Sequence, residues 1–349
     1  MNKDVNDIDL LHIKFTDLEA IFRSDDRQFL ESLARTAQSV TRRYFGRAVG
    51  LYTPLYISNY CENYCAYCGF QVRADIRRKK LTAEEIDQEC RTLHATGIRN
   101  ILILTGESVV YSPVSYIADA IRIAKAYFPN IALEIYPLET EEYRELYLAG
   151  ADGVTLYQET YNRRRYDELH IAGRKKDYDY RYGAPERMAQ AGIRHIALGV
   201  LLGLDDWRED VPRLFEHLRY LEKKYPGTEY GLSFPRLQKV PQDERNYSEV
   251  KDSDMVKIIC TARLLFPRAG INLSTRERAE FRDHIFEFGV TRLSAGSSTR
   301  VGGYSRSLGN GQEGQFHVND SRTLAEVKAM LIHKGYDPVT TDWRRIAND

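Results

Sequence analysis

Three cysteines stand close together near the start of the chain and define the first candidate site. Cys61, Cys65 and Cys68 follow an apolar run at 54–58 and have the spacing C-x3-C-x2-C. Thiolates crowded into one loop are ligands for a metal ion or an iron–sulfur cluster. A four-iron cluster has four corners, so three cysteines would leave one iron open to another ligand.

Other uses of these cysteines fit the sequence less well. A structural zinc site would need a fourth protein ligand at short spacing, but neither a second C-x2-C pair nor an H-x3-H pair follows, and the nearest downstream histidine is His94. Disulfides are disfavoured because the first fifty residues hold no apolar signal segment, and Cys90 and Cys260 stand alone in helical patterns. An iron–sulfur cluster is therefore favoured, with a zinc site and inert cysteines as the remaining alternatives.

The residues around the cysteines resemble the signature of the radical S-adenosylmethionine (SAM) enzymes. Besides the spacing, the loop follows a predicted strand, Tyr67 precedes the last cysteine and Gly69 follows it. The resemblance implies a [4Fe-4S] cluster held by Cys61, Cys65 and Cys68, with SAM bound to the open iron through its amino and carboxylate groups. It also implies a reducing electron donor of the flavodoxin or ferredoxin type, and cleavage of SAM to a 5′-deoxyadenosyl radical.

The overall composition is that of an ordinary globular protein of 349 residues. Lys+Arg and Asp+Glu are equal at 50 each, so no nucleic acid and no anionic membrane surface is expected as a partner. No apolar run approaches the length that a membrane span requires. An exposed iron–sulfur cluster favours a reducing compartment, and a cytoplasmic location is expected.

A repeating unit of apolar run, polar loop and amphipathic helix begins near residue 54 and predicts an α/β fold. Runs that are apolar throughout indicate parallel strands buried on both faces. Eight of them can be counted, at 54–60, 100–107, 131–138, 153–160, 195–203, 230–237, 270–277 and 292–299. Eight such units, together with the radical SAM resemblance, predict a TIM-type (β/α)8 barrel. A doubly wound open sheet is the alternative.

The sequence predicts a barrel with an extension on each side. Residues 1–50 predict a helical extension, residues 51–305 the barrel, and residues 306–349 a C-terminal extension packed on the barrel. No low-complexity or Pro/Gly-rich linker divides the chain. The active site of such a barrel lies at the C-terminal ends of its strands, so polar residues at those ends are the candidate site residues.

The second predicted strand ends in Gly106 and Glu107. Glycine permits a close backbone approach to a ligand, and a glutamate beside it can accept a hydrogen bond from an ammonium group. The pair resembles the Gly-Glu motif with which radical SAM enzymes hold the amino group of SAM. An ordinary strand-to-helix loop is the alternative.

Further SAM contacts are implied on the fourth and fifth strands. By the resemblance, Glu159 with Gln158 binds the ribose hydroxyls, Arg181 binds the SAM carboxylate, Tyr67 contributes to the cofactor site, and Leu202 lies on the strand that contacts adenine. An acidic residue stabilised at a helix N-terminus is the alternative for Glu159, and a solvated surface residue for Arg181.

The remaining strands supply candidates for substrate binding. Arg276 and Ser294 follow the seventh and eighth predicted strands, and Tyr56 lies on the first. An arginine, hydroxyl groups and glycine amides together could hold the carboxylate and amino group of an amino acid. For Arg276 the alternative is a salt bridge within its own loop, which also contains Glu277, Arg278 and Glu280.

Several segments resemble the aromatic amino-acid lyases among the radical SAM enzymes, in particular the tyrosine lyases of thiamine biosynthesis. These segments are 153–161, 231–237, 273–277, 294–297 and 302–304. The resemblance implies cleavage of the Cα–Cβ bond of L-tyrosine to 2-iminoacetate (dehydroglycine) and 4-cresol, with Tyr56, Arg276 and Ser294 anchoring the amino acid. It also implies a thiazole synthase as a possible partner.

Related enzymes remain as alternatives. Tryptophan lyase shares the scaffold, as does a hydrogenase maturase that makes carbon monoxide and cyanide from tyrosine. The maturase holds a second cluster on further cysteines, and no cysteine follows Cys260, so its later chemistry is not expected here. A zinc protein or a cluster protein that only transfers electrons is the alternative outside this group.

Overall fold

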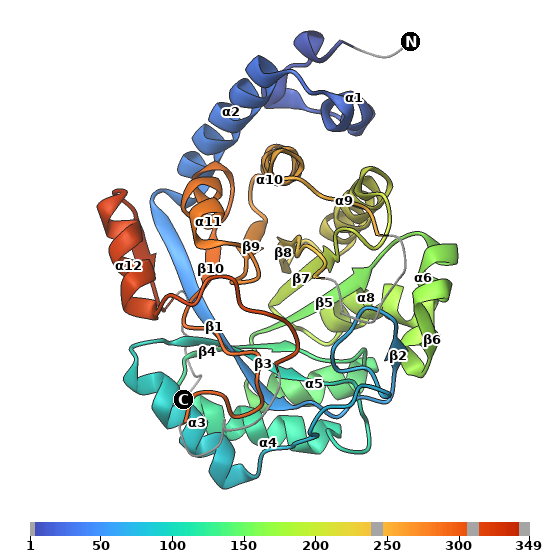
Figure 1. Ribbon diagram of the computed structural model, residues 1–349, viewed down its shortest axis with the longest axis vertical. Coiled ribbons are helices and arrows are strands. Elements are labelled where there is room, and N and C mark those ends of the chain that lie inside the picture. The colour runs from blue at the N-terminus through green and yellow to red at the C-terminus, as the bar shows by residue number, and fades with distance from the viewer. Residues whose placement is uncertain (1–3, 239–246, 306–313, 342–349) are drawn as a thin grey trace.

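A closed ring of parallel strands forms the centre of the molecule (Figure 1). The computed structural model describes residues 4–238, 247–305 and 314–341. Within these residues one sheet has the strand order β10-β9-β8-β7-β5-β4-β3-β1-β11, and β10 also pairs with β1. The sheet therefore closes into a barrel of eight strands, while β11 (Asp337–Val339) pairs with the first residues of β1 outside the ring. The predicted barrel is confirmed, and the open sheet is excluded.

All strand pairings within the ring are parallel. The eight strands are β1 (Ala48–Ser58), β3 (Asn100–Thr105), β4 (Asn130–Glu134), β5 (Gly153–Glu159), β7 (His195–Val200), β8 (Glu229–Ser233), β9 (Gly270–Leu273) and β10 (Arg292–Ser294). Their C-terminal ends meet at one face of the barrel, which is where the site described below lies.

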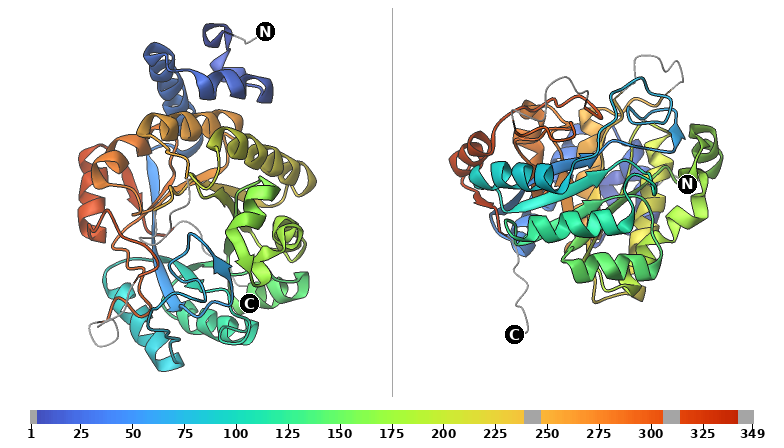
Figure 2. Two further views of the ribbon diagram at one scale, coloured as in Figure 1. Left: turned by 45° about the vertical axis from the view of Figure 1, so that its right-hand side comes forward. Right: turned by 90° about the horizontal axis from the view of Figure 1, so that it is seen from below.

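Helices cover the outside of the ring, as Figure 2 shows. They are α3 (Ala83–Ala95), α4 (Val114–Lys125), α5 (Thr140–Ala149), α6 (Arg163–Leu169), α7 (Tyr178–Tyr182), α8 (Ala184–Gln190), α9 (Trp207–Lys224), α10 (Asp252–Leu265), α11 (Ala279–Ile285) and α12 (Leu324–His333). Because strands lie between the lumen and this helical layer, both faces of a strand are covered. All six residues of β7 are buried, for example, which explains its continuous apolar sequence.

The strand boundaries differ from those predicted. β1 begins at Ala48 instead of at residue 54, because Gly50 to Tyr52 pair with β10 and close the ring. The third run was expected to continue to residue 138, but β4 ends at Glu134. Ile135 and Leu138 are buried in the loop that follows, so they are apolar without belonging to the sheet. The loops at the C-terminal face therefore begin earlier than the sequence indicated.

The N-terminal segment is helical, with α1 (Leu18–Arg23) and α2 (Arg27–Phe45), and lies beside α10 on the outside of the barrel (Figure 1). The Arg263 guanidinium of α10 lies 4.7 Å from the ring centre of Phe45. The division of the chain at residues 50 and 305 stays a prediction, and residues 306–313 and 342–349 lie outside the described residues. Among the described helices, none has both the length and the apolar character needed to cross a bilayer.

Candidate active site

The three cysteines lie in the loop after β1 and line a cavity at the C-terminal face of the barrel. Cys65 belongs to the short strand β2 (Tyr64–Cys65), which pairs with β6 (His170–Ala172) in a separate antiparallel sheet. This second sheet ties the cysteine loop to the segment that follows α6. The cavity has a volume of about 1710 Å³, larger than the roughly 300–1000 Å³ of a site for one small molecule. It has room for several groups at once.

The three thiols are close together in the structure. The charge on Cys68 acts on Cys61 and on Cys65, and burial, with Glu107 and Cys68, raises the pKa of Cys61 to about 11. In a cubane each thiolate binds a different iron, and three cysteines in one loop can supply three such ligands. The cysteine set therefore fits a cluster.

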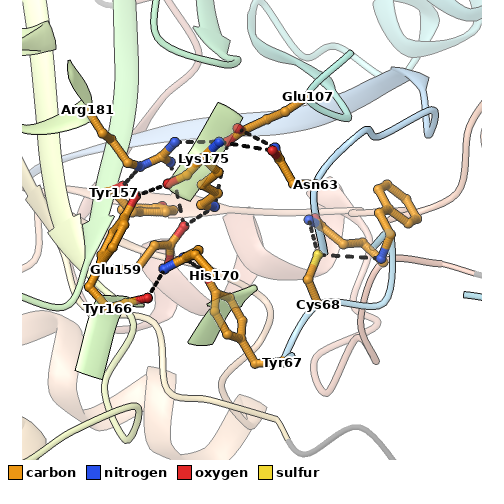
Figure 3. Close-up of polar contacts among 12 residues, drawn as sticks. Asn63, Tyr67, Cys68, Glu107, Tyr157, Glu159, Tyr166, His170, Lys175 and Arg181 are labelled. Atoms are coloured by element: carbon orange, nitrogen blue, oxygen red, sulfur yellow. Dashed lines mark hydrogen bonds and ion pairs between the residues drawn. The ribbon is translucent and has the colours of Figure 1, made fainter. Parts of the chain in front are cut away.

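Tyr67, just before the last cysteine, is fixed by a buried histidine (Figure 3). The Tyr67 hydroxyl lies 2.8 Å from Nε2 of His170, whose Nδ1 lies 2.7 Å from the carbonyl oxygen of Tyr166. Burial, with Lys175 nearby, lowers the pKa of His170 to about 3, so the ring is neutral. A carbonyl can only accept, so Nδ1 donates to it and Nε2 accepts from Tyr67. The tyrosine ring thereby has one fixed orientation.

A buried charged network joins the ends of β3 and β5 to the segment between α6 and α8 (Figure 3). Glu107 accepts hydrogen bonds from Arg181 at 2.9 Å and from the Asn63 amide at 2.9 Å. Lys175 donates to Glu159 at 2.6 Å and lies 3.6 Å from Glu107. Burial by itself would raise the pKa of Glu107, but Arg181 and Lys175 outweigh it and lower that pKa to about 2. The Glu107 carboxylate thus stays ionised between two cations.

Glu159 has an unusual backbone conformation. Its φ is 74°, a left-handed value that is rare for residues other than glycine. The β5–β7 register shifts between Tyr157 and Glu159, so β5 bulges at its C-terminal end. Such bulges redirect a side chain, and here the carboxylate is held by Lys175. Backbone strain kept in place by a surrounding ion network is typical of a functional position.

Packing also requires glycine at position 106, and the predicted approach to a ligand stays a prediction. A side chain at this position would place Cβ 2.2 Å from the carbonyl oxygen of Tyr60. The Gly106 amide donates to the carbonyl of Ser58 at 2.9 Å. The glycine therefore lets the loop after β3 pack against the cysteine loop after β1, and this packing places Glu107 beside Asn63. It also lines the cavity.

Two predicted cofactor residues do not line the cavity within the described part of the chain. Tyr157 and Glu159 face it, and Gln158 between them does not, because alternate residues of a strand point to opposite sides. Just after β7, Leu201 lines the cavity while the side chain of Leu202 is buried in the core. The cofactor contacts of Gln158 and Leu202 stay predictions.

The three predicted substrate residues all line this cavity. The Tyr56 hydroxyl donates to Gln315 at 2.7 Å, and the Ser294 hydroxyl accepts from the amide of Thr275 at 2.9 Å. The Arg276 guanidinium lies 3.7 Å from the ring centre of Phe316. Residues on strands that are distant in sequence therefore meet at one wall.

Arg276 does not form the local salt bridge that was its alternative. The Glu277 carboxylate instead binds Arg236, and Arg278 binds Asp252 at 2.8 Å. No described residue forms an ion pair with the Arg276 guanidinium, and burial lowers its pKa from the ordinary value of 12.5. A partly buried cation without an anion among the described residues, stacked on an aromatic ring and facing a cavity, is suited to binding a carboxylate.

Two residues of the site, Lys175 and His170, were not named from the sequence. Lys175 lies in the basic run 174–176, and its backbone amide donates to the Asn63 side chain at 2.9 Å. His170 is hydrogen-bonded to Tyr67. No local pattern marks either residue, because each is placed by contact with the cysteine loop.

Comparison with known proteins agrees with this site. The chain matches the radical SAM superfamily over residues 55–218 and the Biotin and Thiamin Synthesis associated domain over residues 233–337. It is 37% identical over 333 residues to the 2-iminoacetate synthase of Salmonella typhimurium. The aligned region covers 95% of this chain and 88% of that protein.

Solved structures agree as well. The hydrogenase maturase HydG from Carboxydothermus hydrogenoformans superposes with a TM-score of 0.88 and 32% identity, over 94% of this chain and 76% of that one. The methylornithine synthase PylB superposes with a TM-score of 0.74 over 96% of each chain, and at 23% identity it shows the shared fold alone.

These findings define a class of enzyme in which a parallel barrel presents a three-cysteine loop beside a buried charged network. The chain belongs to the radical SAM superfamily, which implies a [4Fe-4S] cluster and SAM as its cofactors. Within that superfamily it is an enzyme related to 2-iminoacetate synthase.

Replacing Lys175 with methionine is expected to destabilise the protein by about 3 kcal/mol, because a buried network loses one of its cations. The free energy of unfolding can be measured by urea denaturation in the absence of SAM. Lys176→Met is the matched control, since Lys176 is 50% exposed and lies 3.5 Å from Asp167; a change within about 0.5 kcal/mol is expected there. Equal losses in the two variants would contradict a buried role for Lys175.

Proposed function

We propose that the protein is a 2-iminoacetate synthase, a radical SAM lyase that breaks the Cα–Cβ bond of L-tyrosine and yields 2-iminoacetate (dehydroglycine) and 4-cresol. The identity to known 2-iminoacetate synthases along nearly the whole chain supports this activity. The observation that carries the proposal is Arg276, a partly buried guanidinium with no described carboxylate partner in the cavity that also holds the cysteines. It offers an amino-acid carboxylate a site within the same cavity as the cluster.

The roles of the individual residues follow from their positions. Cys61, Cys65 and Cys68 would hold the cluster, and one iron would remain for SAM. When bound, these cofactors supply a 5′-deoxyadenosyl radical that takes a hydrogen atom from the substrate. This part of the proposal rests on the thiols that line the cavity.

The charged network would orient SAM. Glu107 presents its carboxylate to an amino group, Arg181 its guanidinium to a carboxylate, and Glu159 its carboxylate to the ribose hydroxyls. These groups are held rigidly by one another before SAM arrives. A site that is already ordered loses little further freedom on binding.

The amino acid would be held by Arg276, with Tyr56 and Ser294 lining the same cavity. Fixing the carboxylate determines which hydrogen of the substrate lies next to the radical, so the residues act by positioning. Tyr67, whose hydroxyl is hydrogen-bonded to His170, lines the same cavity and would contact the cofactors.

Product analysis tests the proposal. The protein, reconstituted with iron and sulfide under anaerobic conditions, is incubated with SAM and dithionite in the presence of L-tyrosine, of L-tryptophan or of no amino acid. We expect 4-cresol and 5′-deoxyadenosine in the tyrosine reaction, and little 3-methylindole in the tryptophan reaction. Formation of 3-methylindole without 4-cresol would assign the chain to tryptophan cleavage instead.

Two partners follow from this chemistry. Dehydroglycine hydrolyses readily, so direct transfer to a thiazole synthase in the cytoplasm is proposed, and a flavodoxin or ferredoxin would supply the electron. Anaerobic co-elution with a thiazole synthase is the expected result, and separate elution at micromolar concentration of both proteins would count against a stable complex.

A further inference from the structure

Glu134 is a cavity residue to which no role has been given above. It is the last residue of β4 and pairs in register with Leu104 on one side and Thr155 on the other. Ile131 and Leu133 of the same strand are buried against the helices, so the alternation of a strand turns Glu134 to the lumen. It lines the same cavity as the cysteines and Arg276.

The Glu134 carboxylate differs from the two other carboxylates at the ends of neighbouring strands. Glu107 and Glu159 are both neutralised by hydrogen-bonded cations. No described residue forms a hydrogen bond or an ion pair with the Glu134 carboxylate, and only burial and more distant charges act on that group. Burial, assisted by Glu159, raises the pKa of Glu134 to about 7. Binding of a cation to such a carboxylate is favourable, because the cation stabilises its charged form.

The groups that face Glu134 come from several strands. The charge on Glu134 acts on Tyr52 and Tyr56 of β1 and on Tyr157 of β5. The cations that act on it are Arg276, Lys175 and Arg181. Two of these, Lys175 and Arg181, are already hydrogen-bonded to Glu159 and Glu107, respectively.

Glu134 and Arg276 are therefore an unusual pair. Both line one cavity, each acts on the pKa of the other, and they form no ion pair with each other. Unpaired charges of opposite sign cost free energy in a protein interior. A ligand that carries both signs, such as the zwitterion of an α-amino acid, would neutralise both.

We propose that Glu134 binds the α-ammonium group of the amino-acid substrate while Arg276 binds its carboxylate. The assignment rests on the proposed function and extends it to the amino end of the substrate. Charged contacts to both groups on the α-carbon fix the orientation of that carbon. The substrate side chain can therefore point in only one direction. They also select α-amino acids over amines and over carboxylic acids of the same size.

Binding measurements with three ligands test this assignment. The anaerobic protein with cluster and SAM is titrated with L-tyrosine, with tyramine, which lacks the carboxylate, and with 3-(4-hydroxyphenyl)propanoate, which lacks the amine. In Glu134→Gln we expect the Kd of tyrosine and of tyramine to rise about 10- to 100-fold, because a charge-assisted hydrogen bond is lost. The Kd of 3-(4-hydroxyphenyl)propanoate should stay the same or fall. Glu134→Asp keeps the charge and should recover part of the tyrosine affinity.

The outcomes are distinguishable. An equal loss for all three ligands in Glu134→Gln, or no loss for tyrosine, would overturn the assignment. Glu141→Gln, at an exposed position on α5, controls for the substitution itself, and iron content and the urea midpoint confirm that each variant is folded. If the unchanged protein binds no tyrosine, the proposed substrate is wrong, and Glu134 is tested with tryptophan, tryptamine and indole-3-propanoate by the same criteria.

Discussion

Cys65→Ser should abolish both cluster binding and the release of 5′-deoxyadenosine from SAM. Cys65 is buried where β2 pairs with β6. A ligand from solvent therefore cannot take the place of the missing thiolate. With only two thiolates left the cluster loses one of its anchors. Iron and acid-labile sulfide should fall to background after reconstitution, and the brown colour should be lost.

The chain contains its own controls for this result. Cys90 and Cys260 are buried in α3 and α10 and do not line the cavity within the described residues. Cys90→Ala and Cys260→Ala should therefore keep iron, sulfide and SAM cleavage at the level of the unchanged protein. A Cys65→Ser variant that retains the cluster, or a Cys260→Ala variant that loses it, would show that the thiols have been assigned wrongly.

Arg276→Gln is expected to lower kcat/KM for tyrosine cleavage by a factor of roughly 100, since a charged hydrogen bond to the substrate carboxylate contributes about 3 kcal/mol. The effect should appear mainly in KM. Release of 5′-deoxyadenosine without amino acid should be unchanged, because the charged network that we propose as the SAM site does not include Arg276.

Two further variants make this prediction specific. Arg276→Lys keeps the charge without the planar fork of the guanidinium, so an intermediate kcat/KM is expected. Arg278→Gln alters an arginine of the same loop that is 60% exposed and bound to Asp252, and it should behave as the unchanged protein. Normal tyrosine cleavage by Arg276→Gln would remove the main support for an amino-acid substrate.

Residues that lie at strand ends and carry a recognisable motif could be predicted from the sequence. Glu107 and Glu159 follow different strands, and they meet because the ends of parallel strands share one face of the barrel. Arg181 of α7 reaches both carboxylates from the segment that covers this face. Arg276 could be named from the sequence. Its alternative role, a salt bridge within its own loop, could be excluded only from the structure, in which Glu277 pairs with Arg236 instead.

Other residues could not be predicted, for identifiable physical reasons. Glu134 was hidden inside an apolar run that was expected to continue to residue 138, and only the end of pairing at β4 makes it a strand-end residue. Lys175 was hidden in a basic run, and its burial depends on a tertiary contact with Asn63. Gln158 and Leu202 do not line the cavity within the described residues, and their roles stay predictions; the face that a residue takes at the end of a strand depends on local register, as the shift in β5 shows.

The central claim is that three cysteines hold a cluster whose remaining iron binds SAM. Electron paramagnetic resonance of the reduced, reconstituted protein tests it most directly, with spectra recorded without SAM, with SAM, and with SAM labelled with ¹⁷O in its carboxylate. The account predicts a [4Fe-4S]⁺ signal whose g-values shift when SAM is added, and a hyperfine coupling from the labelled carboxylate. Identical spectra with and without SAM, with no coupling from the label, would contradict it.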